Sequence, residues 1–422
     1  MINLSLACLT LSTLTNSPFI SSTFLSKDSK SSFFKLQLSH FSHSFYLSHI
    51  QSSGFKQAIF SGCNFNNFLS NVIKVDQINR MRFQSPNKRM IFSFDNVTVE
   101  NCRFVKIKNC ENTGGALTVF ASLIIFNSYF HDCCGSEGGC ISGHDHFNCS
   151  FTTFELCRAK QSAAFDIRTH AKSQILVSNV AAQALTADFF AFCYATTKGE
   201  FNVDYSNLTD MYANQCVGSL EENGGTYINK FTMFVRSKAK VHNGCLTIRS
   251  SQNFKIENCL FLECSHCSAE NNAGASLLIY DNPYANLISD TLFVNCDADN
   301  SFNVAIASGA SMKFTRCKFT GAREKEVNNQ NMILDSTEFK QSIESNDVMN
   351  DFQQHFTGKT IGYTQIGKEE NNVVGNTMPE KNMPLIHFVA VCISLVISFI
   401  LQKMTTCIMY SVCSRKNMRE NL

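Results

Sequence analysis

The sequence predicts an all-β protein, a right-handed parallel β-helix solenoid with one C-terminal transmembrane helix. Three observations predict it. Short motifs of Phe, Cys and paired glycines recur at intervals of 24 to 32 residues, apolar stretches of strand length follow the small residues, and one uncharged apolar segment lies near the C-terminus. A repeat of this length without helical periodicity is typical of a solenoid, in which each coil packs only on its neighbours.

The composition is compatible with a large folded core. The chain has 422 residues, of which 44% are apolar and 17% charged, so it does not resemble a disordered protein. The net charge of +2 gives no indication of nucleic-acid binding.

The first 20 residues allow two interpretations. The apolar start of the chain is interrupted by Ser and Thr, has no basic segment before it and no clear cleavage site after it. Residues 1–20 are therefore a signal peptide or an ordinary strand, or the chain lacks its true start. We expect the solenoid to occupy residues 21–340.

Two motifs define the repeat. Cys-x-Phe occurs at 63–65, 102–104, 149–151, 259–261 and 317–319, and Phe-x-x-Cys occurs at 130–133, 154–157, 261–264 and 293–296. We expect their side chains to form inward-facing ladders, each filling one layer of the core. The predicted ladder residues are Phe104, Phe130, Cys133, Phe154, Cys157, Phe261, Cys264, Phe293, Cys296 and Phe319. A leucine-rich repeat is excluded because a regular Leu series is absent.

Small residues mark the bends of the chain. Gly114 and Gly115 recur 24 residues later as Gly138 and Gly139. Glycine suits positions where the backbone turns sharply or approaches a neighbour closely. The recurring asparagines suit turn corners, and they are Asn101, Asn127, Asn258 and Asn295.

Apolar stretches at 116–126, 245–256 and 275–281 are predicted strands, by β-branched content and partial alternation. The motifs fade between 171 and 244, where we expect irregular coils with longer loops.

The C-terminal part predicts a membrane anchor. A polar linker at 341–383 leads to an uncharged segment at 384–402, whose 19 residues would span roughly 28 Å as a helix, close to a bilayer core. Basic residues are more frequent after this segment than before it, which places the tail at 403–422 in the cytoplasm. The expected protein is a single-pass type I plasma-membrane protein with an extracellular solenoid.

The 20 cysteines leave two alternatives open. Sixteen of them lie between Cys63 and Cys317, an even number that would suit disulfides in an exported protein. Buried free thiols are the other interpretation, because Cys is among the most buried residue types.

The Gly-Gly-Ala-Leu at 114–117 and the Phe-x-x-polar elements over 60–320 resemble the repeats of chlamydial polymorphic membrane proteins. They are similar, more closely, to β-helix surface proteins of parasitic protists such as trichomonads. The chain departs from the bacterial pattern in having Cys where Asn is usual and in ending in an apolar segment. The resemblance implies a parallel β-helix and, through the bacterial family, adhesion to host cells.

The sequence gives no convincing catalytic or metal site, and no cofactor is expected. Gly143-His144-Asp145-His146 with Cys149, Cys133-Cys134 with Cys140, and Cys264 with Cys267 invite metal or redox interpretations. A polar turn, repeat positions and disulfides or core thiols explain them better. Asp145 and Asp166 occupy different repeat positions, so the paired carboxylates of a polysaccharide hydrolase are not evident.

We therefore expect a surface protein that binds a host or environmental glycan or protein. A polysaccharide lyase or hydrolase on the same fold and a structural coat protein are the alternatives. N-glycosylation patterns begin at Asn96, Asn148 and Asn207.

Overall fold

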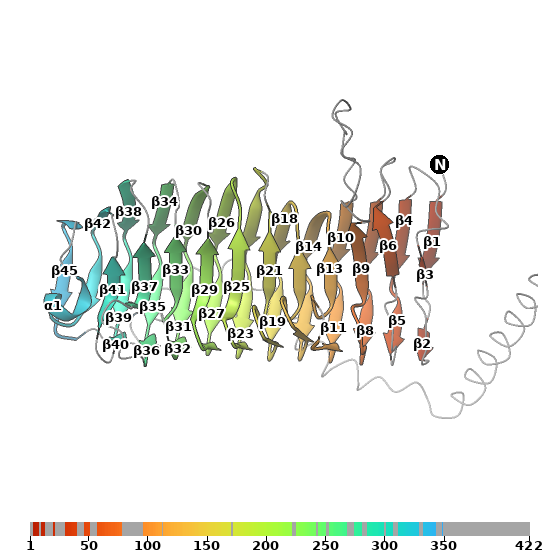
Figure 1. The fold of residues 1–422 in the computed structure, drawn as a ribbon, viewed down its shortest axis with the longest axis horizontal. Helices are drawn as coiled ribbons and strands as arrows, with labels where there is room; N and C mark the ends of the chain where they lie inside the picture. Colours follow the sequence, from red (N-terminus) through yellow and green to blue (C-terminus); the bar gives the residue numbers. More distant parts are fainter. Residues whose placement is uncertain are drawn as a thin grey trace, which may run out of the picture. The chain divides into compact units, whose positions relative to one another are not determined.

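The computed structural model describes residues 3–7, 10–12, 20–21, 30–39, 46–50, 57–77, 96–111, 113–169, 172–221, 225–241, 244–249, 253–267, 274–280, 285–298, 301–306, 311–328, 332–342 and 348. Over these residues the chain is a parallel β-solenoid, with a short helix, α1 (Arg323–Glu326). Figure 1 shows the strands of successive coils side by side. The predicted span at 384–402 lies outside this set, and within it no helix is long and apolar enough to cross a membrane.

The strands form four parallel sheets, which we name A to D. Sheet A comprises β1 (Asn3–Ala7), β4 (Lys30–Phe34), β7 (Gln57–Ser61), β10 (Asn96–Glu100), β14 (Ser122–Phe126), β18 (Phe147–Ser150), β22 (Ile175–Ser178), β26 (Glu200–Asp204), β30 (Thr226–Lys230), β34 (Asn253–Glu257), β38 (Ala285–Ser289), β42 (Ser311–Thr315) and β44 (Met332–Asp335). Sheet B comprises β2 (Thr10–Ser12), β5 (Gln37–Ser39), β8 (Asn64–Asn66), β11 (Arg103–Val105), β15 (Tyr129–His131), β19 (Thr153–Glu155), β23 (Ala181–Gln183), β27 (Asn207–Thr209), β31 (Met233–Val235), β35 (Leu260–Leu262), β39 (Leu292–Val294), β43 (Lys318–Thr320) and β45 (Glu338–Lys340).

Sheet C comprises β3 (Ile20–Ser21), β6 (Tyr46–Ile50), β9 (Ile73–Gln77), β13 (Leu117–Val119), β17 (Ile141–Gly143), β21 (Phe165–Arg168), β25 (Phe190–Thr196), β29 (Cys216–Glu221), β33 (Leu246–Arg249), β37 (Gly274–Tyr280) and β41 (Phe302–Ile306). Sheet D comprises β12 (Lys108–Asn109), β16 (Cys134–Gly135), β20 (Arg158–Ala159), β24 (Thr186–Ala187), β28 (Tyr212–Ala213), β32 (Lys238–Ala239), β36 (Ser265–His266) and β40 (Asp297–Ala298).

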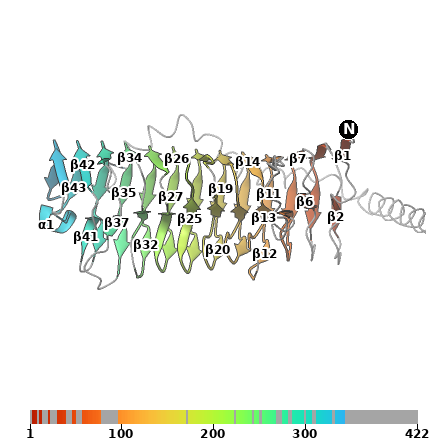
Figure 2. The ribbon, with the colours of Figure 1, turned by 45° about the horizontal axis from the view of Figure 1, so that its top comes forward.

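Each full coil visits the sheets in the order A, B, D, C. The chain runs from β10 through β11, β12 and β13, and then enters the next coil at β14, which pairs in parallel with β10. Figure 2 shows the same stacking from a second direction. Because every coil repeats this path, residues at equivalent positions of successive coils form columns along the solenoid.

The Phe ladder fills the core beneath sheet B. The rings of Phe104, Phe130 and Phe154 stack with centroids 4.7 and 5.1 Å apart. A second run stacks at 4.8, 5.0 and 4.5 Å and contains Phe234, Phe261, Phe293 and Phe319. The predicted ladder Phe residues in both runs are fully buried.

Two corners of each coil use left-handed backbone. The first corner joins a sheet A strand to a sheet B strand, and the second joins sheet B to sheet D. Asn101, Asn127 and Asn258 occupy first corners with φ of 53°, 46° and 52°, and Asn295 occupies a second corner with φ of 50°. Asparagine tolerates this conformation better than most residues, which explains its recurrence.

The residue after each first corner carries a buried thiol or hydroxyl in most coils. Its Sγ or Oγ donates a hydrogen bond to the carbonyl oxygen two residues earlier, as from Cys102 to Glu100, Ser128 to Phe126 and Thr152 to Ser150. Some second corners follow the same rule, since Cys157 Sγ lies 3.2 Å from the Glu155 oxygen. In other coils the equivalent position holds an apolar residue, as at Ile107, Leu185 and Met211. Cysteine at these positions therefore satisfies a corner carbonyl, and Ser or Thr can replace it.

This rule corrects one member of the Cys-x-Phe set. Cys149 lies within β18 and is paired with Ile125 and Val177, whereas Phe151 is a first-corner residue with φ of 51°. The position equivalent to Cys102 is instead Thr152. The prediction that Cys149 occupies the repeat slot is wrong, because the hydroxyl equivalent was not recognised.

The double glycines lie where coils approach closely. A Cβ added to Gly115 would lie 1.8 Å from the Gly139 carbonyl oxygen, and one added to Gly139 would lie 2.2 Å from that of Ala163. Gly114 has φ of +63°, and Gly138 pairs with Ser162 in an isolated parallel bridge. The close approach predicted for these positions is confirmed.

Two of the predicted strands are each two strands. The stretch 116–126 contains β13 of sheet C and β14 of sheet A, and 245–256 contains β33 and most of β34. The stretch 275–281 falls largely within β37. Apolar content continues through the corner between sheets C and A because that corner is also packed against the core, as at buried Ala121.

The stretch 171–244 forms stacked coils where the structure describes it, with one register shift between Phe190 and Cys193, where β25 pairs with β29. β22 pairs with β26 and β26 with β30, with a shift of 26 residues in both cases (Ile175 to Phe201 to Tyr227). The prediction of longer loops is wrong there, and the predicted irregularity is limited to that register shift. Ala182 and Leu208 occupy the positions of the Phe ladder, so the fold continues while the motif disappears.

At the N-terminus, β1 and β2 pair with β4 and β5. The signal peptide at 1–20 and the right-handed sense of the coils stay predictions.

Candidate functional site

A cleft of about 570 Å³ follows the first corners near the end of the solenoid. Its lining residues come from five successive coils and the adjoining edge of sheet B: Phe231, Asn258, Asp290, Leu292, Arg316, Cys317, Lys318, Ser336 and Glu338. The first-corner members project outward because the core-facing positions lie on either side of each corner. The cleft is thus a product of stacking, and each coil contributes one to three residues.

One end of the cleft is aromatic. The Phe231 ring stacks on Tyr205 with centroids 4.8 Å apart and an interplanar angle of 5°. Tyr205 is the first-corner residue of the preceding coil, so it covers one face of the Phe231 ring. The opposite face lies toward Asn258, the next first-corner residue.

The carboxylates of the cleft are paired with cations. Arg316 Nε and Nη2 donate to the two oxygens of Asp290, both at 2.7 Å. This pair lowers the Asp290 pKa and raises that of Arg316. Lys340 Nζ lies 3.0 Å from Glu338 Oε2 and lowers the Glu338 pKa. Both carboxyl groups are therefore held ionised near neutral pH.

An apolar patch on the outer face of sheet B adjoins this cleft. Met233, Val235, Leu260, Leu262 and Val294 flank the inward-facing Phe residues of β31, β35 and β39, and all are buried. Phe231 and Leu292 belong both to the cleft and to this cluster. Val348, from the predicted linker at 341–383, packs against the patch and is 6% exposed.

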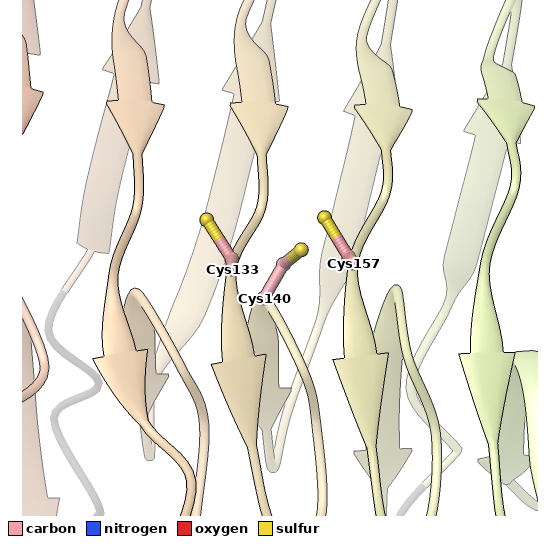
Figure 3. Close-up of side chains that lie close together, drawn as sticks. All are labelled: Cys133, Cys140 and Cys157. Carbon is pink, nitrogen blue, oxygen red and sulfur yellow. The ribbon is translucent and has the colours of Figure 1, made fainter.

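Three thiols meet in the core between two coils. Cys133 and Cys157 occupy the same second-corner column, and Cys140 faces them from the start of the sheet C side (Figure 3). Their sulfur atoms all lie within 4.8 Å of one another, and all three residues are buried. A metal site needs at least three His, Cys, Asp or Glu side chains whose ligand atoms lie close together. In the part of the chain that the structure describes, these three cysteines are the group that meets this condition.

The three thiols influence one another's pKa values. Burial raises the pKa of Cys133 and of Cys140. At Cys157 burial acts in the same direction, but hydrogen bonds from Cys133 and Cys140 outweigh it and lower the pKa. Hydrogen bonds within the trio therefore stabilise a thiolate among the three sulfur atoms.

The structure divides the other cysteine groups. Cys134 forms a disulfide with Cys110 across adjacent coils, so it does not join Cys133 and Cys140. Cys264 is a buried thiol and Cys267 an exposed one, which separates the Cys-x-x-Cys pair. Of the cysteines that the structure describes, 14 are free thiols, so buried thiols predominate over disulfides in this part of the chain.

The His-Asp-His stretch forms separate contacts. His144 stacks on Phe120 at 4.0 Å, Asp145 accepts a hydrogen bond from Ser173 Oγ at 3.0 Å, and His146 accepts one from the Gln174 amide at 3.1 Å. These partners favour the interpretation as a polar turn.

Asp166 is the carboxyl group most perturbed on sheet C. Burial raises its pKa to about 6, although Arg168 binds both of its oxygens at 2.9 Å. Asp145 contacts Ser173 instead, so the two acids considered from the sequence have different partners.

The three glycosylation candidates lie on outer faces. Asn96 and Asn148 belong to sheet A and Asn207 to sheet B, and each is partly exposed beside a buried neighbour. Thr209 Oγ1 donates to Asn207 Oδ1 at 2.8 Å.

Sequence reasoning missed the cleft. The signal that could have revealed it is the column of residues one position before each Cys, Ser or Thr of the corner motif. Comparison with known proteins gives no match to a family profile, a curated protein or a solved structure.

Proposed function

We propose that this protein is a membrane-anchored surface module that binds a glycan through the cleft beside the first corners. The observation that carries the proposal is the lining of that cleft: an aromatic ring at one end, followed by amide, hydroxyl and charged side chains. Aromatic faces pack on sugar rings, and polar side chains bond sugar hydroxyls. A volume of about 570 Å³ suits a ligand of a few sugar units.

The paired carboxylates favour binding over hydrolysis. A glycosidase needs one carboxyl group with a raised pKa to protonate the leaving group. Asp290 and Glu338 instead have lowered pKa values because Arg316 and Lys340 accompany them. Arg316 has a raised pKa, which makes it a poor base for a lyase.

Two sequence features support the surface location. The apolar segment at 384–402 is long enough for a membrane span. The repeat motifs resemble those of surface proteins, including a bacterial family associated with adhesion to host cells, although that is an analogy of fold.

The test uses a substitution that preserves the corner. Phe231→Asn removes the ring, and Asn already occupies this column at Asn258 and Asn179. Phe151→Asn makes the same change at a first corner outside the cleft and is the matched control. It is combined with Thr153→Val, because asparagine before Thr152 and Thr153 would otherwise create an N-glycosylation pattern. The full-length chain is displayed on cells and tested against a glycan array, with soluble products analysed for cleavage.

We expect wild type and Phe151→Asn to retain the same glycans, and Phe231→Asn to bind them at least about tenfold more weakly. Equal loss in both variants would contradict the cleft as the site. Cleaved products would favour the enzyme alternative, and an array without retained glycans would favour a structural coat protein.

A further inference from the structure

The repeat accounts for two of the three core thiols but not for the third. In the thiol form, Cys133 and Cys157 donate to the carbonyl oxygens of His131 and Glu155, as the corner rule requires. Cys140 occupies a column in which the preceding and following coils have Ala116 and Ala164. A larger, sulfur-bearing side chain therefore faces two corner thiols at this coil. Cys245 occupies the same column in a later coil and interacts with Cys264. In the described part of the chain, however, the group whose three sulfur atoms lie within 4.8 Å of one another is that of Cys140.

We propose that Cys133, Cys140 and Cys157 form a three-sulfur site for Cu(I), which the chain binds as these coils fold. The site is separate from the cleft and does not depend on the glycan-binding proposal.

The geometry fits a three-coordinate ion. With metal–sulfur bonds of about 2.3 Å, a trigonal site places its sulfur atoms about 4 Å apart. The three sulfur atoms already lie within 4.8 Å of one another, so they would converge by less than about 1 Å. Thiolate ligands select soft ions, of which Cu(I) and Zn²⁺ are the common choices.

The number of ligands favours Cu(I) over Zn²⁺. Structural zinc sites take four protein ligands. Within the described part of the chain the group contains three donors. A fourth donor would be needed to complete a zinc site.

Binding releases the thiol protons, because cysteine binds a metal as the thiolate: Cu(I) and three thiols give a tris-thiolate copper complex and three protons. No electron is transferred in this step. Because the side chains are buried, the ion enters before the coils close.

The test compares copper content in matched variants. Cys140→Ala introduces the residue of both adjacent coils, so it removes one ligand while preserving packing. Cys149→Val is the control, since it removes another buried thiol flanked by Ile125 and Val177. The full-length chains are refolded without oxygen in the presence of Cu(I), freed of loose ions with a Cu(I) chelator, and analysed for metal and by X-ray absorption.

We expect wild type and Cys149→Val to retain one more equivalent of copper than Cys140→Ala, with three sulfur neighbours around it. Circular dichroism and melting of the metal-free chains establish that Cys140→Ala folds. Equal copper content in a folded Cys140→Ala and wild type would overturn the proposal, as would a disulfide within the trio detected by mass spectrometry in chains kept reduced during refolding.

Discussion

The Phe ladder can be tested at Phe261, which has an aromatic neighbour on both sides. Its ring is fully buried and stacks on Phe234 at 4.8 Å and on Phe293 at 5.0 Å, nearly parallel to both. Phe261→Ala should lower the free energy of unfolding by about 3–5 kcal/mol, because it removes a buried ring and leaves a cavity.

Phe261→Leu separates stacking from burial. Leu208 already occupies this column, so an aliphatic side chain is compatible with the coil. The substitution retains most of the apolar volume but removes two aromatic pairs, each of which contributes about 0.5–1.5 kcal/mol. We therefore expect a destabilisation of about 1–3 kcal/mol for Phe261→Leu.

Amide hydrogen exchange is the appropriate assay, because a repeat protein opens locally and each coil contacts only its neighbours. Peptides covering β31, β35 and β39 should lose protection about a hundredfold or more in Phe261→Ala and less in Phe261→Leu. Peptides covering β11 and β15 should change little. Ile333→Ala, at an outward side chain that is 62% exposed, is the control, with an expected effect within about 0.5 kcal/mol. Equal effects of the two Phe261 variants would refute the stacking contribution, and an unaffected Phe261→Ala would refute the ladder.

Three further predictions concern a corner, a buried acid and the disulfide. Lys106 has φ of 54°, a left-handed conformation that costs a residue with a side chain about 1–2 kcal/mol. Lys106→Gly should therefore raise the melting temperature and Lys106→Val should lower it; melting temperatures in the reverse order would contradict this. Burial raises the Glu326 pKa to about 7, so the folded state binds the proton more tightly than the unfolded state, whose pKa is near 4.5. Stability should therefore fall as the pH rises through this interval, and Glu326→Gln should flatten the profile of melting temperature against pH; an unchanged slope would exclude the assignment. Reducing the Cys110–Cys134 bond, which joins residues 24 apart, should lower the free energy of unfolding by about 3 kcal/mol, measured by denaturant titration with and without a reductant. Cys110→Ser should be insensitive to the reductant, and a wild type that is equally insensitive would show that the bond contributes nothing.

The fold class could be predicted because a solenoid repeats its local rules. Phe104, Phe130 and Phe154 recur at nearly fixed intervals, and the structure stacks them directly on one another. Asn at the corners was informative for the same reason, since few residues adopt positive φ without strain. The coils around Ala182 and Leu208 were not recognised from the sequence because the residue at the ladder position is not Phe. Their backbone nevertheless follows the same path as that of the other coils.

The sites were less predictable. Cys-x-Phe was read as a sulfur motif, whereas the chain requires only a short donor after the corner, which Ser128 and Thr152 supply equally well. The disulfide, the cleft and the thiol trio each combine residues of different coils. Their separations along the chain vary with every insertion, so no fixed spacing identifies them.

The sequence by itself determined that extended segments stack with aromatic and sulfur side chains inward, because a periodic pattern of buried residues is a local property that each coil repeats. Only the tertiary structure decided which thiols meet, which cysteines pair and where the outer surface becomes hollow. Those contacts depend on the exact register between coils, and a shift of one residue would turn the same side chains to the opposite face.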